Sequence, residues 1–346
     1  MRIEISSAAL LAGLTLAGAQ TAPITGNKPG ATFVVQDAEI HGPLTMILYG
    51  DQRFMDPRNN SQSSPAMRQA LVKQIALEKP TAIVLNGDVP NDGRQKEDYA
   101  VFQSETQIWR AENLRVYPTL GNHEIIGDAK PCLENWWNAF PQLRDRRWYS
   151  TQLGSRIYIL ALDSMSSLLV GSEQAKWVAQ QIDGMSGTVD FLIITMHHPP
   201  VADVQTHILV DHNPRPNEMA LRDYLALRAP KIHARILVSA GHVHNYERRE
   251  QDGITYLVSG GGGAFPYIVE RTPGDLYQDT AFPNYHYVKC VLEGQTLKSI
   301  MYRASDPENI DSKFEQKDAF AITAKSRKPA TIAVGAGKAL VSPAKP

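Results

Sequence analysis

The chain has 346 residues, of which 43% are hydrophobic, so it can bury a substantial core in one large domain or two ordinary ones. It carries 35 Lys and Arg residues against 36 Asp and Glu residues, a balance that argues against nucleic acid or an anionic membrane as a partner. Cys132 and Cys290 are its only cysteines, too few for a disulfide framework. The sequence leaves their pairing open and favours two unpaired, buried thiols.

Residues 1–19 differ from the rest of the chain and have the pattern of a signal peptide. Arg2 lies next to Met1, the run from Ser6 to Ala19 is small and apolar, and Ala17-Gly18-Ala19 forms an A-x-A cleavage pattern. The run is too short for a membrane span. We therefore expect an exported protein, periplasmic or secreted, without membrane attachment after cleavage. Glu4 reduces the positive charge at the start of the segment. A buried N-terminal helix is therefore the alternative interpretation.

Residues 20–43 are rich in Pro and Gly and are expected to form a linker with at most one strand, at 31–35. The predicted domain, residues 44–304, begins with alternating strands and helices. Strands are predicted at 45–49, 82–85 and 114–120, and helices at 65–79 and 97–111. Ser64 and Pro65 are typical of a helix start, and Pro80 of a helix end. This order predicts a parallel sheet with right-handed crossovers.

The second half of the domain predicts further helices and strands and one long loop. Helices are expected at 133–140, 173–185 and 218–227, and strands at 148–150, 156–162, 191–195, 236–238 and 256–259. A hairpin is predicted from 285–292 and 296–303, with its turn at Gly294. The loop 201–216 follows a strand directly and is expected to touch substrate. Residues 305–346 are expected to form a C-terminal extension that is largely a disordered tail.

Polar side chains follow five of the apolar runs, each at the end of a predicted strand. The five sequences are Gly50-Asp51, Asn86-Gly87-Asp88, Gly121-Asn122-His123-Glu124, Met196-His197-His198-Pro199-Pro200 and Gly241-His242-Val243-His244. Open α/β sheets place their sites at the carboxyl ends of strands. Carboxylate, imidazole and amide donors without a thiolate suit Zn, Mn, Fe or Mg. A carboxylate on a tight turn can bridge two ions, and such a pair activates water for an in-line displacement.

In their order and spacing, these five motifs resemble those of the calcineurin-like metallophosphoesterase superfamily. The longer run from Gly241 to Arg248, GHVHNYER, is similar to the last motif of the purple acid phosphatases. The resemblance covers about residues 44–303. It implies an α/β fold, a four-layer α-β-β-α sandwich of two mixed sheets packed face to face, with the site at the carboxyl ends of the strands. It also implies two divalent or trivalent metal ions as cofactors.

Matched residue by residue, the resemblance assigns a role to each polar side chain of the motifs. Asp88 would bridge both ions; Asp51 and His244 would hold the first ion, and Asn122, His197 and His242 the second. His197 is preferred to His198 because the family places its ligand in the pattern His-x-Pro. His123 would be catalytic and unligated, beside the phosphate, where it stabilises the transition state or protonates the leaving oxygen.

Two positions depart from the family pattern. Arg53 stands where most of the superfamily has a His ligand, and Asn91 stands where purple acid phosphatases have a Tyr ligand. The first ion thus has only three evident protein ligands, and no purple colour is expected even with iron. Asn91 is expected to orient the catalytic His123. Arg53 is either a structural cation facing Asp51 or another acid, or a cation that binds the substrate phosphate.

Three further features are left open by the residues alone. His198 is expected to be a packed neighbour of the site rather than a ligand. His207 and His212 lie on the loop 201–216 and are either solvated or in contact with phosphate or leaving group. The glycine run at 260–263 lacks the spacing of a nucleotide-binding loop and predicts a turn near the site.

These features together predict an exported, metal-dependent hydrolase of phosphate esters that uses a two-metal-activated water. Phosphomonoesters are favoured, and the expected partner is a small phosphate-ester substrate. One alternative is a phosphodiesterase acting on nucleotides or lipid head groups. A second is a degenerate metal-binding module with weak catalysis, since the first ion has few ligands.

Overall fold

The computed structural model describes residues 30–59, 61–206 and 212–326 of the chain. The predicted signal peptide at 1–19, His207 and residues 327–346 lie outside this part. Among the described residues, no helix is both long enough and apolar enough to cross a membrane.

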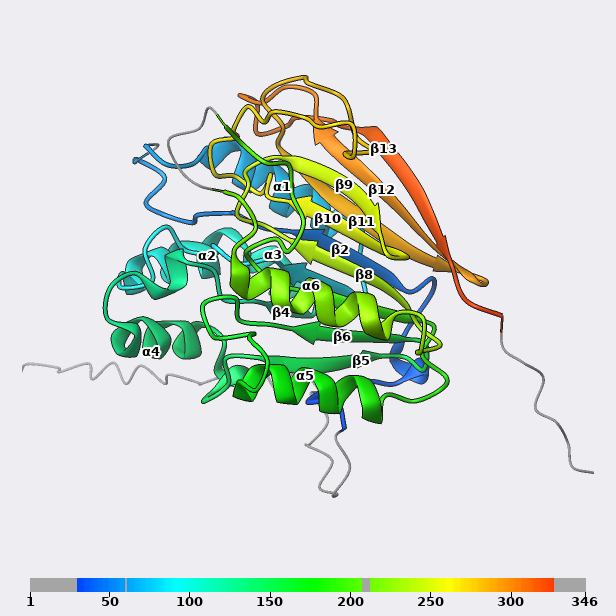
Figure 1. Ribbon diagram of the computed structural model, residues 1–346. Helices are drawn as coiled ribbons and strands as arrows, with labels where there is room; N and C mark the ends of the chain where they lie inside the picture. Colours follow the sequence, from blue (N-terminus) through cyan, green and yellow to red (C-terminus); the bar gives the residue numbers. More distant parts are fainter. Residues whose placement is uncertain (1–29, 60, 207–211, 327–346) are drawn as a thin grey trace, which may run out of the picture.

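Two mixed sheets lie at the centre of the molecule (Figure 1). The larger sheet has seven strands in the order β1-β5-β6-β7-β8-β10-β9. These strands are β1 (Phe33–Val35), β5 (Tyr149–Leu153), β6 (Ile157–Ala161), β7 (Phe191–Thr195), β8 (Arg235–Ala240), β9 (Tyr246–Gln251) and β10 (Ile254–Ser259). Strands β6, β7, β8 and β10 run parallel, so their carboxyl ends share one edge.

The smaller sheet has six strands in the order β13-β12-β11-β2-β3-β4. They are β2 (Thr45–Tyr49), β3 (Ala82–Leu85), β4 (Val116–Pro118), β11 (His286–Glu293), β12 (Thr296–Ala304) and β13 (Phe314–Thr323). Strands β2, β3 and β4 run parallel, as the alternating pattern of strands and helices predicts. Strands β11, β12 and β13 continue the sheet in antiparallel fashion.

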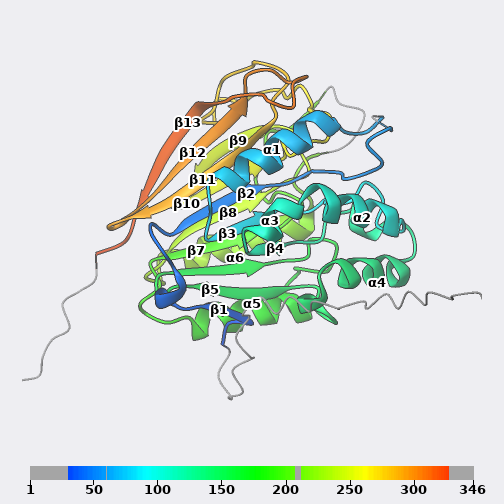
Figure 2. The same cartoon turned by 180° about the vertical axis from the view of Figure 1, so that it is seen from behind.

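Helices cover the outer face of each sheet, which makes four layers. Helices α5 (Glu173–Gly184) and α6 (Pro216–Arg228) lie in front in Figure 1, over the seven-stranded sheet. The opposite view shows the other helices, α1 (Pro65–Leu77), α2 (Lys96–Glu105), α3 (Gln107–Ala111) and α4 (Ala129–Ala139), on the far side (Figure 2). Single 3-10 turns occur at Asp37–Glu39, His123–Ile125 and Pro141–Leu143. The predicted four-layer sandwich of two mixed sheets is confirmed.

The central strands form because their side chains are apolar on both faces. Every residue of β2, β3, β6 and β7 is buried, as expected for strands that are covered by helices on one side and by another sheet on the other. The predicted helix start at Ser64 is also present, since its side chain accepts a hydrogen bond from the Met67 N–H at 3.3 Å. Cys132 and Cys290 are buried and unpaired, which confirms the expectation of two free thiols.

Three elements differ from the sequence-based prediction. The helix predicted at 97–111 is interrupted at Thr106, whose hydroxyl donates to the Phe102 carbonyl and competes with the helical bonding pattern. Strand β9 was missed because it is rich in charged residues, as edge strands commonly are. Strand β13 was missed for a related reason: it lies at the other sheet's edge and is largely exposed. The sheet therefore continues beyond residue 304, where the sequence indicated the end of the domain.

Candidate metal centre

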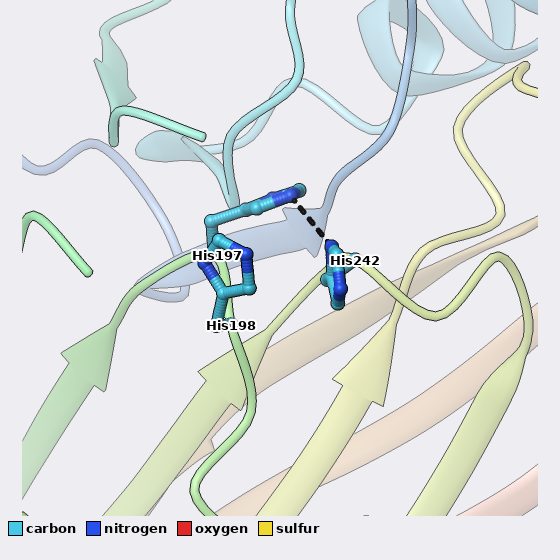
Figure 3. Close-up of side chains that lie close together, drawn as sticks. All are labelled: His197, His198 and His242. Carbon is cyan, nitrogen blue, oxygen red and sulfur yellow. Dashed lines mark hydrogen bonds between the residues drawn. The ribbon is translucent and has the colours of Figure 1, made fainter. Parts of the chain in front are cut away.

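The five polar loops meet at one edge of the sandwich because each follows a parallel strand. Asp51 follows β2, Asp88 follows β3, and Asn122 follows β4 in the smaller sheet. The loops after β7 and β8 supply His197 and His242 from the larger sheet (Figure 3). Hydrogen bonds join the two halves of the site, since the Asp51 carboxylate accepts the His242 backbone N–H at 2.9 Å.

The backbone of these loops is unusual in a way that points to function. Several non-glycine residues of the site have the left-handed conformation, which L-residues seldom adopt: Asp51 (φ 62°), Arg53 (φ 47°), Asp88 (φ 56°) and His242 (φ 71°). Such strained residues cluster at active sites and persist only where the surroundings fix them. Here the buried Glu124 carboxylate fixes the turn by accepting the N–H groups of Asp88, Val89 and Gly121.

Two glycines of the motifs are required by close packing. A Cβ on Gly121 would overlap the Asp88 carboxylate, and a Cβ on Gly241 would lie 2.5 Å from Asp51 Oδ2. Both glycines thus let the backbone approach the carboxylates that the motifs deliver.

Three possible ligand atoms lie close to His197 Nε2 at the second predicted metal position. His197 Nε2 lies 2.9 Å from Asn122 Oδ1, 3.3 Å from Asp88 Oδ1 and 3.3 Å from His242 Nδ1 (Figure 3 shows the two histidines). The other ring nitrogen of His197 lies 2.9 Å from the Asn86 carbonyl, where it donates its hydrogen. This contact leaves the Nε2 lone pair directed at the other three donors, as in metal-ligating histidines.

The first predicted position has three donors, from Asp51, Asp88 and His244, whose ligand atoms lie within 4.8 Å of one another. His244 Nδ1 is 2.8 Å from the Phe265 carbonyl and donates to it. Its Nε2 atom is buried, has no hydrogen-bond partner and lies 3.4 Å from Asp51 Oδ1. The buried Nε2 of His244, without a hydrogen-bond partner and beside the carboxylates of Asp51 and Asp88, is suited to bind a metal ion. Because Asp88 belongs to both donor groups, the residues fit a pair of ions with Asp88 between them.

Burial keeps His198, His242 and His244 in the neutral form that binds metals. It lowers the pKa of His244 to about 3 and that of His198 to about 2, and it holds the pKa of His242 far below its ordinary value. Burial also raises the pKa of Asp51 to about 7, and the charge of Asp88 adds to this effect. Burial opposes ionisation of Asp88 too, but His197, His123 and Arg53 lower the pKa of Asp88 below its usual range.

His123 lies at the edge of these donors rather than among them. Its backbone N–H donates to Asp88 Oδ1 at 2.9 Å, and its Nε2 is 3.9 Å from Asp88 Oδ2. Its Nδ1 contacts the backbone carbonyl of Asn91. The contact that orients the ring therefore comes from the Asn91 main chain, whereas the Asn91 side-chain oxygen is buried without a partner.

Arg53 faces the bridging carboxylate. Its Nη2 atom lies 3.4 Å from Asp88 Oδ2, and its side chain is 12% exposed. Its buried Nε atom has no hydrogen-bond partner. The acid that Arg53 faces is therefore Asp88 and not Asp51. The Nε–H donor of its guanidinium group makes no hydrogen bond.

Three more side chains lie at the site, His198, His212 and Tyr267, and of these Tyr267 was missed by sequence reasoning. His198 joins His197 and His242 in a group of possible metal ligands, with its Nδ1 2.8 Å from the Ser164 hydroxyl. His212, from the loop before α6, places its Nδ1 3.2 Å from His242 Nε2. Tyr267 stacks on both His212 and His244. The glycine run at 260–263 turns beside Gly50 and Asp51, in keeping with the predicted turn near the site.

Comparison with known proteins agrees with this geometry. Residues 61–246 match the family described as calcineurin-like phosphoesterase. The chain is 28% identical over 145 residues to purple acid phosphatase 1 of Ipomoea batatas, a match that covers 38% of this chain and 28% of that protein. It is also 28% identical over 156 residues to Fe(3+)-Zn(2+) purple acid phosphatase 12 of Arabidopsis thaliana, covering 41% of this chain and 31% of that protein. The matches thus span less than a third of these relatives.

Solved structures share the fold at low sequence identity. Purple acid phosphatase PPD1 from yellow lupin (Lupinus luteus) superposes with a TM-score of 0.67 at 17% identity, over 82% of this chain and 54% of that one. GAP50 of Plasmodium superposes with a TM-score of 0.57 at 13% identity, over 83% of this chain and 90% of that one. The family match over residues 61–246 covers more than half of the chain and includes four of the five motifs. The chain belongs to the calcineurin-like phosphoesterases.

Proposed function

We propose that the chain is a metal-dependent phosphomonoesterase. The proposal is supported by Asp88, which lies with Asp51 and His244 on one side and 3.3 Å from His197 Nε2 on the other, and by His123 beside it. Asp51 and His244 would hold the first ion, and Asn122, His197 and His242 the second. Two ions bound there would lower the pKa of a water to near 7 and clamp the attacking and leaving oxygens.

His123 would act as the general acid in this reaction. Its Nδ1 is engaged by the Asn91 carbonyl, so its Nε2 is the atom available to hold a proton for the leaving oxygen. Its side chain is 18% exposed, whereas that of Asp88 is buried, so a substrate entering from solvent can reach it. A site that only binds metal has little need of such a residue, which argues against the degenerate binding module.

Arg53 would bind the phosphate group. Guanidinium cannot ligate a metal, because it keeps its protons, but it pairs well with phosphate oxygens. Its contact with Asp88 at 3.4 Å and its unused Nε donor support this role. A dianionic monoester gains more from this cation than a singly charged diester does.

The test is hydrolysis of p-nitrophenyl phosphate against bis(p-nitrophenyl) phosphate by the purified protein, with Zn, Mn, Fe and Mg screened in turn. The proposal expects metal-dependent turnover with a higher kcat/KM on the monoester. A higher kcat/KM on the diester would favour a phosphodiesterase of nucleotides or lipid head groups. Stoichiometric metal binding without turnover on either ester would favour the binding module.

We also propose that the protein is exported to the periplasm or medium. The support is the sequence of residues 1–19 with its Ala17-Gly18-Ala19 pattern.

A further inference from the structure

Tyr267 reaches the metal centre from a segment that none of the five motifs contains. It follows the glycine run after β10, and its backbone N–H donates to the His244 carbonyl at 3.0 Å. Its own carbonyl accepts the Asn245 side-chain amide at 2.6 Å. These two bonds fix the segment against the last motif, so the position of the Tyr267 ring is tied to that of His244.

The Tyr267 ring is stacked between two histidines. Its centroid lies 4.2 Å from that of His244 at an interplanar angle of 12°, and 4.8 Å from that of His212 at 24°. His212 in turn contacts His242, a donor of the second metal position. Two stacked neighbours leave the ring little freedom to turn. The direction of its hydroxyl is therefore set before any substrate binds.

The Tyr267 ring lies at the charged part of the site, because it is stacked on His244, whose Nε2 is 3.4 Å from Asp51 Oδ1. Burial raises the pKa of the Tyr267 phenol, and the charges of Arg53, Asp51 and Asp88 also act on it. Arg53 is also 3.4 Å from Asp88 Oδ2 and has a free Nε donor. A phenol donor and a guanidinium thus lie together beside the bridging carboxylate. Both side chains are partly exposed, whereas Asp51 and Asp88 are buried, so a ligand from solvent meets this pair first.

We propose that Tyr267, acting with Arg53, donates a hydrogen bond to a non-bridging oxygen of the substrate phosphate and so makes the site selective for monoesters; this inference rests on the function proposed above. A monoester phosphate offers three strong acceptor oxygens and nearly two negative charges. Two metal ions held by the donors of the site would engage two of these oxygens. The third is then free for the Arg53–Tyr267 pair, and a diester lacks that third oxygen.

The experiment compares Tyr267→Phe with the unchanged protein, both loaded with metal. Tyr267→Phe removes the hydroxyl and keeps the stacked ring. Calorimetric titration with inorganic phosphate should show a dissociation constant raised about tenfold, the effect of losing one hydrogen bond to a charged group. Metal content by elemental analysis should not change. The kcat/KM for p-nitrophenyl phosphate should fall more than that for bis(p-nitrophenyl) phosphate.

Tyr256→Phe is the matched control, because the Tyr256 hydroxyl is buried on β10 without a hydrogen-bond partner. It should leave phosphate binding unchanged. An unchanged dissociation constant in Tyr267→Phe, an equal loss on both esters, or a loss of metal would overturn the inference. If the unchanged protein hydrolyses neither ester, the proposed function fails, and the phosphate titration still decides the role of Tyr267.

Discussion

His123 is held by two neighbours at the edge of the metal centre, through the Asn91 carbonyl and the Asp88 carboxylate. His123→Ala should lower turnover by about 10²–10⁴, the range for general acid–base groups. Its backbone bond to Asp88 remains in the variant, so the metal content should not change. Steady-state kinetics with elemental analysis checks both. Loss of metal would make His123 a ligand, and unchanged turnover would remove its catalytic role.

Arg53→His restores the residue that most of the family has at this position. The imidazole should tighten binding of the first ion, because it adds a ligand beside Asp51 and His244. The loss of the guanidinium should raise the KM for p-nitrophenyl phosphate, because one phosphate contact disappears. Metal titration and kinetics on the same preparation separate the two effects. A simultaneous gain in metal affinity and kcat/KM would show that Arg53 has no substrate role.

The motif residues could be located from sequence because each ends a parallel strand, and strand ends meet at one edge. The contacts around these residues could not be predicted from the sequence in the same way. The orienting group for His123 is a main-chain carbonyl of Asn91, which any residue type would supply. Tyr267 is missed because nothing local marks it. Its position depends on a loop that folds back over His244, which is twenty-three residues earlier in the chain.

At the level of the elements, the edge strand β9 and the chain segment after β7 are joined by a buried pair of acids. Glu247, on β9, accepts the Asp203 backbone N–H at 2.6 Å. Its other carboxyl oxygen and Asp203 Oδ2 are buried without partners. Burial, with the charge of Asp203, raises the pKa of Glu247 to about 8. Glu247 thus keeps its proton near neutral pH, and the neutral acid stabilises the loop against β9.

This pair predicts a pH dependence of stability. In the unfolded chain Glu247 ionises near its ordinary value, about 4.3. The folded state therefore binds the extra proton between that value and about 8, so the stabilisation is present at low pH and lost as pH rises through this window. Glu247→Gln cannot titrate. Its free energy of unfolding, from denaturant titrations at pH 5 and pH 8.5, should fall less than that of the unchanged protein. Equal losses would contradict the assignment.

The sequence predicted the buried central strands but not the strands at the sheet edges. Strands buried on both faces, such as β3 and β7, were predicted because continuous apolar runs identify them. The edge strands β9 and β13 were not, since one side of each lacks a partner strand and their residues are largely polar. Their pairing with β10 and β12 is a tertiary contact that no local pattern records.

In the whole molecule, the two sheets each supply half of the candidate metal centre. Asp51, Asp88 and Asn122 follow strands of the smaller sheet, and His197, His242 and His244 follow strands of the larger one. The site therefore exists only in the assembled sandwich. We expect metal binding to stabilise the fold, because ions that bind only the native state shift the folding equilibrium towards it.

The proposed export can be tested at the N-terminus of the mature protein. Cleavage after Ala19 should leave Gln20 as the first residue of the mature protein. N-terminal sequencing of protein recovered from the periplasm or the medium checks this expectation. A retained Met1 in that fraction would contradict it.

We propose that one carboxylate, Asp88, holds two metal ions together. It is completely buried, and its Oδ1 faces His197 while its Oδ2 faces Arg53. The most direct measurement is the metal content of purified Asp88→Ala by elemental analysis, beside that of the unchanged protein. We predict about two ions per chain in the unchanged protein and loss of both in the variant, because the bridging charge offsets repulsion between the ions. Full occupancy in Asp88→Ala would contradict the two-metal site.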